Sequence, residues 1–473
     1  MLGFGVTALM LVGSGALHYY LWVRLVRDTT RPGTRARRLG TGAVVVSALV
    51  APGTRILTPL FDPGDGGAGR WVAWPGYTWI GVLMYLLLAL AALEVPRALV
   101  LRAWRRRAGA RERAGADAPE PAPEPEAAVP GARPVPVPVG GAAAPEAPAP
   151  ALETPAADAQ APAPEEPEQR EEPERPEGPE QPERPGAPGA GRPGLGRRLF
   201  LGRTVGALAG ATSLGTVAHG MSVALGDPMI KRVPITLSKV DARLAGLRIA
   251  VVSDIHLGPL LGRAHTERVV RMVNALQPDL VTIVGDLADG TAAQLGPAAR
   301  PLRGLESRYG SFFVTGNHEY LYDGVEDWLD EMRNVGVRPL VNERVEIRHN
   351  GAFLDLAGVE DLAGEESGRG PDLARALAGR DTARPVVLLA HQPVFAGEAA
   401  RHGVDLQLSG HTHGGQMFPL TAVTALANPV SSGLGRVDDT TLYVTNGAGF
   451  FGPPLRVGVP ADISLLELRA PAR

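Results

Sequence analysis

Hydrophobic and polar positions divide this chain into regions with different patterns. Residues 2–23, 41–60 and 75–95 are mainly apolar, and each run is close to the ~20 residues that cross a bilayer as a helix. Arginines gather between the first two runs and after the third, whereas the 61–73 loop holds few. The positive-inside rule therefore predicts three transmembrane spans within 1–114, with the N-terminus and this loop outside the cytoplasm. A signal peptide followed by a soluble helical hairpin is the alternative.

Residues 115–195 consist mainly of Pro, Ala, Glu and Gly and carry almost no large apolar side chains. Such a segment cannot bury enough surface to offset the entropy lost on ordering, so we predict a disordered linker with stiff polyproline-II runs. It is interpreted either as a tether between two domains or as an inert low-complexity insert.

The segment 196–228 combines paired arginines with a weakly apolar stretch. Arg197 and Arg198 precede Leu-Phe-Leu, and residues 204–226 follow. This arrangement resembles a twin-arginine export signal, although it is internal and has glycines at Gly196 and Gly202. We predict that the segment acts as a signal or a fourth span and places the following residues outside the cytoplasm. A soluble helix packed on the domain surface is the alternative.

The remaining residues, 229–473, alternate short apolar runs with helical periodicity. Strands are predicted at 247–253, 280–284, 311–315, 352–357, 386–390, 404–408, 441–445 and 463–468, and helices at 264–277, 325–334 and 371–378. This order predicts a mixed α/β domain with a layered sheet core. About 240 residues are enough for a substantial core.

Composition limits the chemistry that this domain can use. The 473 residues carry a formal net charge of -3, which gives no whole-chain signal for a nucleic-acid partner. The chain has no cysteine, so disulfides, thiolate metal sites and cysteine nucleophiles are excluded.

Polar residues with metal-binding side chains follow five of the predicted strands. They are Asp254 and His256, Asp286, Asn317, His391, and His411 with His413. Each alone could be a turn residue or a core histidine, but the carboxyl ends of strands in α/β sheets meet at one edge. Nitrogen and oxygen ligands without thiols suit Mn, Fe or Zn. Seven ligands are too many for one ion with an open position, and they fit two ions that share a bridging carboxylate.

These blocks, in this order, resemble the calcineurin-like metallophosphoesterase superfamily over roughly residues 245–470. The blocks are Asp-x-His, Gly-Asp, Gly-Asn-His-Glu, a single His, and Gly-His-x-His. The form Gly-His-Thr-His-Gly-Gly-Gln at 410–416, preceded by a membrane or twin-arginine segment, is similar to a membrane-associated bacterial subgroup. The resemblance implies a four-layer α/β/β/α domain.

The resemblance also implies a role for each site residue. Asp254, His256 and His413 would bind one divalent ion. Asn317, His391 and His411 would bind the other, and Asp286 would bridge the two. His318 would lie over the substrate phosphate, oriented by Asp289. Phosphoprotein phosphatases carry an arginine directly after that acid, but Gly290 stands here, which argues against a Ser/Thr phosphoprotein phosphatase and leaves phosphate recognition unassigned.

The sequence thus predicts a membrane-anchored phosphohydrolase that cleaves phosphoester bonds by a metal-bridging hydroxide. Glycines at 285, 316 and 410 are expected to allow close approach at the site. Monoester and diester substrates stay equally open, and a lipid or cell-envelope phosphoester is the expected partner. The alternatives are a non-catalytic metal-binding sensor or scaffold and a nuclease that uses the same site. No basic aromatic groove is evident in 230–473, so no nucleic acid is expected.

Overall fold

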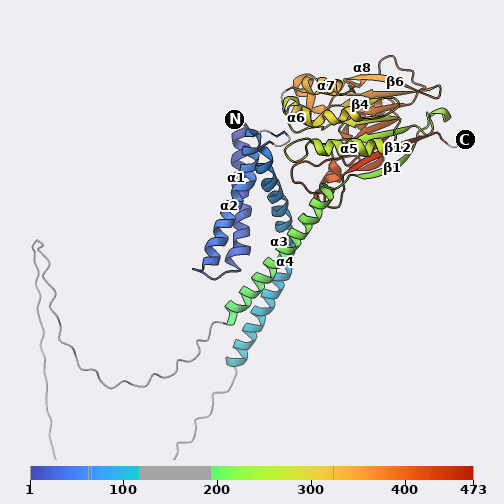
Figure 1. Cartoon of the computed structure of the whole chain (residues 1–473). Helices are drawn as coiled ribbons and strands as arrows, with labels where there is room; N and C mark the ends of the chain where they lie inside the picture. The colour runs from blue at the N-terminus through green and yellow to red at the C-terminus, as the bar shows by residue number, and fades with distance from the viewer. Residues whose placement is uncertain (1, 62, 65–66, 117–192, 323, 472–473) are drawn as a thin grey trace, which may run out of the picture. The chain divides into compact units, whose positions relative to one another are not determined.

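The computed structural model (Figure 1) describes residues 2–61, 63–64, 67–116, 193–322 and 324–471. The chain divides into two units, one of Met1–Leu101 together with Arg192–Arg473 and the other of Arg102–Gly191. The predicted linker, 115–195, lies almost wholly outside the described residues. Its disorder therefore stays a prediction.

In the part of the chain that the structure describes, four α-helices precede the α/β domain: α1 (Leu2–Leu21), α2 (Arg35–Leu57), α3 (Gly69–Ala116) and α4 (Pro193–Ala224). Among the described residues, two helical segments are long and apolar enough to cross a membrane, Arg35–Leu57 and Gly69–Ala110. They coincide with the second and third predicted spans. Protein buries only 11% and 28% of their apolar windows, which is unlike the core helices of a soluble domain. The first and fourth predicted spans also form helices, α1 and α4.

Close packing and ion pairs join the first three helices. A Cβ atom at Gly76 of α3 would lie 1.6 Å from the Thr54 Oγ1 of α2, so only glycine permits this approach. Nearer the other end of α3, Arg24 Nε lies 2.6 Å from Glu94 Oε1. Arg97 Nη2 lies 3.2 Å from Asp28 Oδ2. These contacts fix α2 and the turn after α1 against α3.

Two six-stranded mixed sheets form the α/β domain. The first has the order β1-β12-β2-β3-β4-β5 and the second β10-β11-β9-β8-β7-β6. Their strands are β1 (Met229–Thr236), β2 (Arg248–Val252), β3 (Leu280–Val284), β4 (Ser311–Val314), β5 (Val337–Pro339), β6 (Glu343–His349), β7 (Ala352–Gly358), β8 (Val386–Leu389), β9 (Leu406–Ser409), β10 (Gly433–Val437), β11 (Thr440–Val444) and β12 (Asp462–Arg469). Strands β2 to β5 run parallel, as do β7, β8, β9 and β11. Each site-bearing strand therefore sends its carboxyl end to the same edge as its neighbours.

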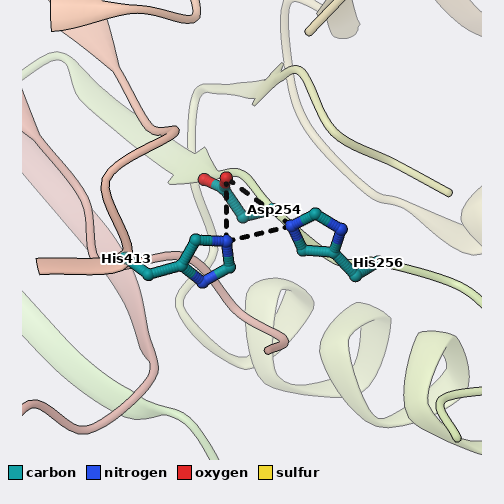
Figure 2. Close-up of side chains that lie close together, drawn as sticks. All are labelled: Asp254, His256 and His413. Carbon is teal, nitrogen blue, oxygen red and sulfur yellow. Dashed lines mark hydrogen bonds and ion pairs between the residues drawn. The ribbon is translucent and has the colours of Figure 1, made fainter. Parts of the chain in front are cut away.

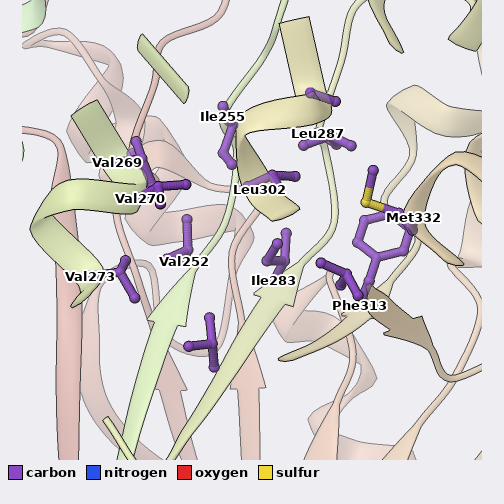
Figure 3. Packing of buried hydrophobic residues seen from close by; sticks show 14 of the residues in the cluster. Val252, Ile255, Val269, Val270, Val273, Ile283, Leu287, Leu302, Phe313 and Met332 are labelled. Carbon is purple, nitrogen blue, oxygen red and sulfur yellow. The ribbon is translucent and has the colours of Figure 1, made fainter. Parts of the chain in front are cut away.

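Three hydrophobic clusters define four layers. Helices α5 (Arg263–Ala275), α6 (Ala292–Ala299) and α7 (Val325–Asn334) cover the first sheet, where Val273, Phe313 and Met332 share one cluster (Figure 3). A second cluster lies between the sheets. Helices α8 (Leu373–Ala376) and α9 (Ala396–Arg401) cover the second sheet. The predicted α/β/β/α fold is thus confirmed, and buried strands such as β2 and β3 are apolar on nearly every position because layers cover both of their faces.

All eight predicted strands and three predicted helices are present, but sequence reasoning missed several elements. The missed strands are β1, β5, β6 and β10, and the missed helices are α6, α9 and α10 (Leu420–Ala427). Strands β1 and β10 lie at sheet edges and are exposed or half-buried along most of their length, so they lack the continuous apolar run that reveals a buried strand. Helix α10 is apolar and has no buried residue.

Candidate metal centre

The site begins where backbone pairing continues past the ends of β2 and β3. Asp254 N–H donates to Gly285 O (3.0 Å), and His256 N–H donates to Asp286 O (3.2 Å). This pairing carries an acid and a histidine from one strand beside an acid from the next. Asn317 follows β4, His391 follows β8, and His411 and His413 follow β9. The structure brings all seven predicted ligands to this edge.

Asp254, His256 and His413 form one cluster, in which the three side chains point toward one another (Figure 2). The Nε2 atoms of His256 and His413 are 2.9 Å apart, and His413 Nε2 is 3.4 Å from Asp254 Oδ1. All three residues are buried. Two imidazole nitrogens and a carboxylate facing one point are a donor set that a divalent cation fits.

Asp286, His391 and His411 form a second cluster. His391 Nε2 lies 3.2 Å from Asp286 Oδ2, and His411 Nδ1 lies 2.8 Å from Asn317 Oδ1. Asp286 also belongs to a third group with His256 and His318, in which the ligand atoms lie within 4.8 Å of one another. One carboxylate therefore borders both sets of donors.

The backbone at this site is strained. Five of the seven predicted ligands have positive φ angles: Asp254 (52°), His256 (51°), Asp286 (52°), His411 (70°) and His413 (50°). Non-glycine residues adopt this left-handed conformation at a cost of order 1 kcal/mol or more each, and such residues concentrate at functional sites. The strain turns these side chains out of the strand direction and toward the two clusters.

Glycines give the ligands room. A Cβ atom at Gly316 would lie 2.3 Å from Asp286 Oδ1, and one at Gly410 would lie 2.3 Å from Asp254 Oδ2. Gly285 has a φ angle of +80°, and a Cβ there would lie 2.6 Å from His391 Nδ1. The close approach predicted at these three glycines is confirmed.

Asp289 contacts two histidines rather than the one that the sequence predicted. Its Oδ1 lies 2.8 Å from His256 Nδ1 and 2.7 Å from His318 Nδ1. A carboxylate accepts only, so its hydrogen bond places the proton of His256 on Nδ1 and leaves His256 Nε2 facing the centre, while His318 contacts the same oxygen as an ion pair. Burial alone would raise the pKa of Asp289, but His256 and His318 lower it to about 2. Burial alone would lower the pKa of His318, but Asp289 and Asp286 raise it to about 9.

Hydrogen bonds of two further residues, His391 and Glu319, hold the metal centre in place. His391 Nδ1 donates to Val284 O (2.7 Å), which leaves its Nε2 facing Asp286. The buried Glu319 carboxylate accepts from the backbone N–H groups of Asp286 (3.1 Å), Leu287 (2.8 Å) and Gly316 (2.6 Å). Burial and the nearby Asp286 raise the pKa of Glu319 to about 7. The last residue of the Gly-Asn-His-Glu block thus positions the loop that carries Asp286.

Arg456 is a supporting residue that sequence reasoning missed. It is only 1% exposed. Its guanidinium donates to His413 O (3.1 Å), Asn446 O (2.9 Å) and Gly449 O (3.2 Å), and its Nη2 lies 3.1 Å from His413 Nδ1. Arg456 therefore ties His413 to the 446–449 loop. No motif precedes it, and its position depends on contacts between distant segments.

Gln416, which the sequence left without a role, holds a loop over the centre. Its amide donates to Phe451 O (3.0 Å) and Pro453 O (3.2 Å), and its carbonyl accepts from Phe451 N–H (3.0 Å). The Phe451 ring packs 4.8 Å from the His318 ring and 5.5 Å from the His256 ring, centroid to centroid. The Gly-Gly-Gln end of the histidine block therefore positions an aromatic wall beside His318.

Comparison with known proteins agrees with this architecture. The family described as calcineurin-like phosphoesterase matches residues 247–415. An uncharacterized metallophosphoesterase of Helicobacter pylori is 39% identical over 258 residues, which cover 54% of this chain and 68% of the relative. An uncharacterized metallophosphoesterase of Aquifex aeolicus is 36% identical over 227 residues, covering 47% of this chain and 85% of the relative.

The name of a third relative describes a transmembrane protein. The "Transmembrane protein with metallophosphoesterase domain" of Bos taurus is 43% identical over 263 residues, or 53% of this chain and 59% of the relative. The chain thus spans about three fifths of the length of this curated relative. The fold and the buried His/Asp clusters are those of a metallophosphoesterase domain. The chain belongs to the calcineurin-like metallophosphoesterase family.

Proposed function

We propose that this protein is a membrane-anchored phosphohydrolase that uses two divalent ions and works outside the cytoplasm. The observation that carries the proposal is the shared carboxylate: Asp286 belongs both to the group with His256 and to the group with His391 and His411. An acid between two donor sets is what a dinuclear centre requires, and a single-ion site would not need it.

The donor distances support one assignment of ligands. Asp254, His256 and His413 would hold the first ion, and Asn317, His391 and His411 would hold the second, with Asp286 between them. Mn, Fe and Zn all fit these nitrogen and oxygen donors.

The chain's own groups would supply the rest of the chemistry. Two divalent ions, when bound, lower the pKa of water and stabilise the negative charge that develops on phosphoryl oxygens. Asp289 would hold the His318 ring by its Nδ1–H, so that Nε2 faces the centre. Asp289 and Asp286 raise the pKa of His318 and so favour the protonated form of its ring. A protonated His318 would donate a proton to the leaving oxygen of the substrate.

The proposed membrane arrangement divides the chain into a span region (1–114), a linker (115–195), a twin-arginine-like segment (196–228) and the catalytic domain (229–473). Arginine placement supports a domain outside the cytoplasm. A cavity of about 360 Å³ is lined both by Gly64, Arg70, Trp71 and Trp74 and by residues of the 258–262 loop. The predicted outer loop thus lies beside the catalytic domain, which supports placing that domain on the same side of the membrane. The subgroup that best suits this arrangement is the membrane-associated bacterial one.

Helix α10 supports a position at the membrane surface. Leu426 is 90% exposed, Val423 is 62% exposed and Phe418 is 60% exposed, and 418–427 contains no charged residue. The Tyr85 hydroxyl of the apolar helix α3 donates to Phe418 O (2.9 Å). An exposed apolar patch that continues from a candidate span is suited to lipid contact.

The test uses the full-length protein purified in detergent. After chelation and reloading with Mn, Fe or Zn, we expect two ions per chain by elemental analysis and hydrolysis of p-nitrophenyl phosphate or bis-p-nitrophenyl phosphate. His411→Ala should abolish turnover, whereas His402→Ala, at a surface histidine paired with Glu398, should not. Bound metal without turnover on either substrate would favour the sensor or scaffold function.

Protease treatment of intact cells tests the orientation. It should remove an outward-facing catalytic domain and spare an inward-facing one.

A further inference from the structure

A pocket beside the metal centre is built from both the catalytic domain and the N-terminal helices. This rim pocket has a volume of about 310 Å³, and its walls include Arg55, Phe61, Tyr77, Leu260, Asp289 and Phe451. His256 and Asp289 also border it, so a molecule held there reaches the metal centre. Pockets of this size hold small ligands or part of a larger one.

The walls of the rim pocket are largely apolar. Phe451, Leu260 and Leu261 contribute from the catalytic domain, Phe61 contributes from the connection between α2 and α3, and Tyr77 contributes from α3. Phe61 is 40% exposed although it is a large apolar side chain. A substrate that is polar throughout would gain little from such walls, because burial of apolar surface is their main source of binding free energy.

Arg55 is the one Lys or Arg among the described residues that line the rim pocket. It lies in the last turn of α2, and it is exposed. Burial raises the pKa of Tyr322, Asp289 raises it further, and Arg55 opposes them, so the Arg55 charge acts at this wall of the pocket. Gly290 lies in the same wall and contributes no side chain. A guanidinium can donate two parallel hydrogen bonds to the oxygens of a phosphate, so Arg55 is the phosphate-binding candidate of this wall.

Specific contacts hold the helical wall against the catalytic domain. A Cβ atom at Gly81 of α3 would lie 2.2 Å from Leu455 Cδ1, and Arg456 N–H donates to Gly220 O of α4 (3.0 Å). Tyr85, Val217, Met417 and Leu455 form one buried cluster across these elements. The position of Arg55 follows from this packing, because Gly76 fixes α2 on α3.

The rim pocket lies where two candidate spans end. Helix α2 ends at Leu57 and α3 begins at Gly69, so a short connection places both ends at the same membrane face. Trp71 and Trp74 lie in the first turns of α3, as aromatic residues do at the level of lipid headgroups. A phosphate at that level, attached to acyl chains in the membrane, would meet Arg55 and the apolar walls together.

We infer that the N-terminal helices complete the substrate site and that its ligand is a phosphorylated lipid. Arg55 binds an oxygen of the headgroup phosphate, and the wall that includes Phe61 and Tyr77 contacts the beginning of the acyl chains. This inference rests on the proposed function, because the same phosphate would be the group that is hydrolysed at the metal centre.

The experiment compares two probes that share a headgroup. Dioctanoyl phosphatidic acid and glycerol 3-phosphate are tested on the full-length protein in detergent, as competitive inhibitors of p-nitrophenyl ester hydrolysis and for their effect on the thermal midpoint. The variants are Arg55→Gln and Phe61→Ala, both at exposed positions that should not disturb folding. Arg35→Gln is the matched control, since Arg35 is an exposed arginine at the opposite end of the same helix.

We expect the lipid to inhibit at least about tenfold more tightly than glycerol 3-phosphate. Loss of a charge-assisted hydrogen bond in Arg55→Gln should weaken both probes about tenfold. Phe61→Ala should weaken the lipid severalfold and glycerol 3-phosphate much less, and Arg35→Gln should match the wild type. Equal inhibition by the two probes, or an Arg55→Gln protein that matches Arg35→Gln, would overturn the inference. If no phosphoester is hydrolysed, the proposed function fails instead, and the thermal shifts still report whether the lipid binds.

Discussion

The metal centre and the rim pocket are built from the sequence in different ways. Every predicted metal ligand lies within four residues of a strand end, and five strands supply all of them. The rim pocket instead combines Arg55 of α2 with the 258–261 loop and the 450–452 loop, which are far apart along the chain. The chemistry of the site is therefore encoded locally, and its substrate preference depends on packing between distant segments.

This difference has a functional consequence. Changes in the metal centre should reduce turnover of every phosphoester alike, since each substrate meets the same ions. Changes in the rim pocket should alter which phosphoesters bind. The strained φ angles at Asp254, Asp286 and His411 indicate that the centre is held rigidly. Exposed residues such as Arg55 and Phe61 can be replaced with little effect on the fold.

The largest expected effect is that of Asp286→Asn. The amide keeps the size of the side chain but loses the negative charge that borders both donor sets, so both ions should bind poorly. We expect kcat to fall by about 10³-fold or more, which corresponds to about 4 kcal/mol, on soluble and lipid substrates alike. Steady-state kinetics and elemental analysis measure the two effects.

Asp330→Asn is the control for this substitution, because Asp330 is an exposed acid that pairs with Arg333 on α7. Its activity and metal content should equal those of the wild type. Asp286→Asn protein that retains two ions and near-normal turnover would contradict the dinuclear assignment. Loss of turnover on one substrate only would contradict the claim that the metal centre acts on all phosphoesters alike and that only the rim pocket sets substrate preference.

Arg456→Met should have the second-largest effect, and it would be an effect on stability. Methionine fills much of the same volume but removes the donors to His413 O, Asn446 O and Gly449 O. Leaving these buried carbonyls without donors should lower the free energy of unfolding by about 3 kcal/mol. Denaturant unfolding followed by circular dichroism measures this loss, and metal affinity should fall with it.

Arg456→Lys is the informative comparison. A lysine keeps the charge but cannot reach several carbonyls with a planar fork, so its stability should lie between those of the wild type and Arg456→Met. If Arg456→Met were as stable as the wild type, the guanidinium would not hold His413, and the support of the metal centre would come from its strand ends alone.

The sequence predicted the buried strands and the metal ligands well for one physical reason. A strand buried on both faces is a short apolar run, and a ligand that directly follows it is visible by position, as with Asp286 after 280–284. Edge strands such as β1 lack that run. Arg456 and Arg55 lie in no motif, and each meets a distant segment of the chain, His413 for Arg456 and the 450–452 loop for Arg55. Gln416 was visible in the histidine block, but its partner Phe451 was not.

A smaller effect on stability should come from His265 on α5, which contacts the 446–449 loop beside the metal centre. His265 is buried and hydrogen-bonds the backbone of Ala448. Burial and the nearby Arg268 lower the pKa of His265 from 6.5 to about 4. Below pH 6.5 the unfolded state binds a proton at His265 that the folded state does not bind until the pH nears 4. The free energy of unfolding therefore decreases as the pH falls from 6.5 toward 4.

Between pH 7 and pH 5 this single group should reduce the free energy of unfolding by about 2 kcal/mol. Denaturant unfolding at the two pH values measures the change, and His265→Gln should show a pH dependence smaller by that amount. An identical pH dependence in the two proteins would show that His265 titrates normally in the folded state.

The smallest expected effect, Gln416→Leu, tests whether the two regions are separable at the point where they meet. Gln416 follows the histidine block, yet its hydrogen bonds hold Phe451 in the rim pocket. Leucine is similar in size and removes all of them. The loosened wall should lower the affinity for dioctanoyl phosphatidic acid by about tenfold, or about 1.4 kcal/mol, with metal content unchanged. Inhibition by glycerol 3-phosphate in the same samples is the internal control and should change little, because this probe lacks acyl chains. A fall in bound metal with equal weakening of both probes would instead assign Gln416 to the metal centre, and the boundary between the two regions would have to be moved to include the 450–453 loop.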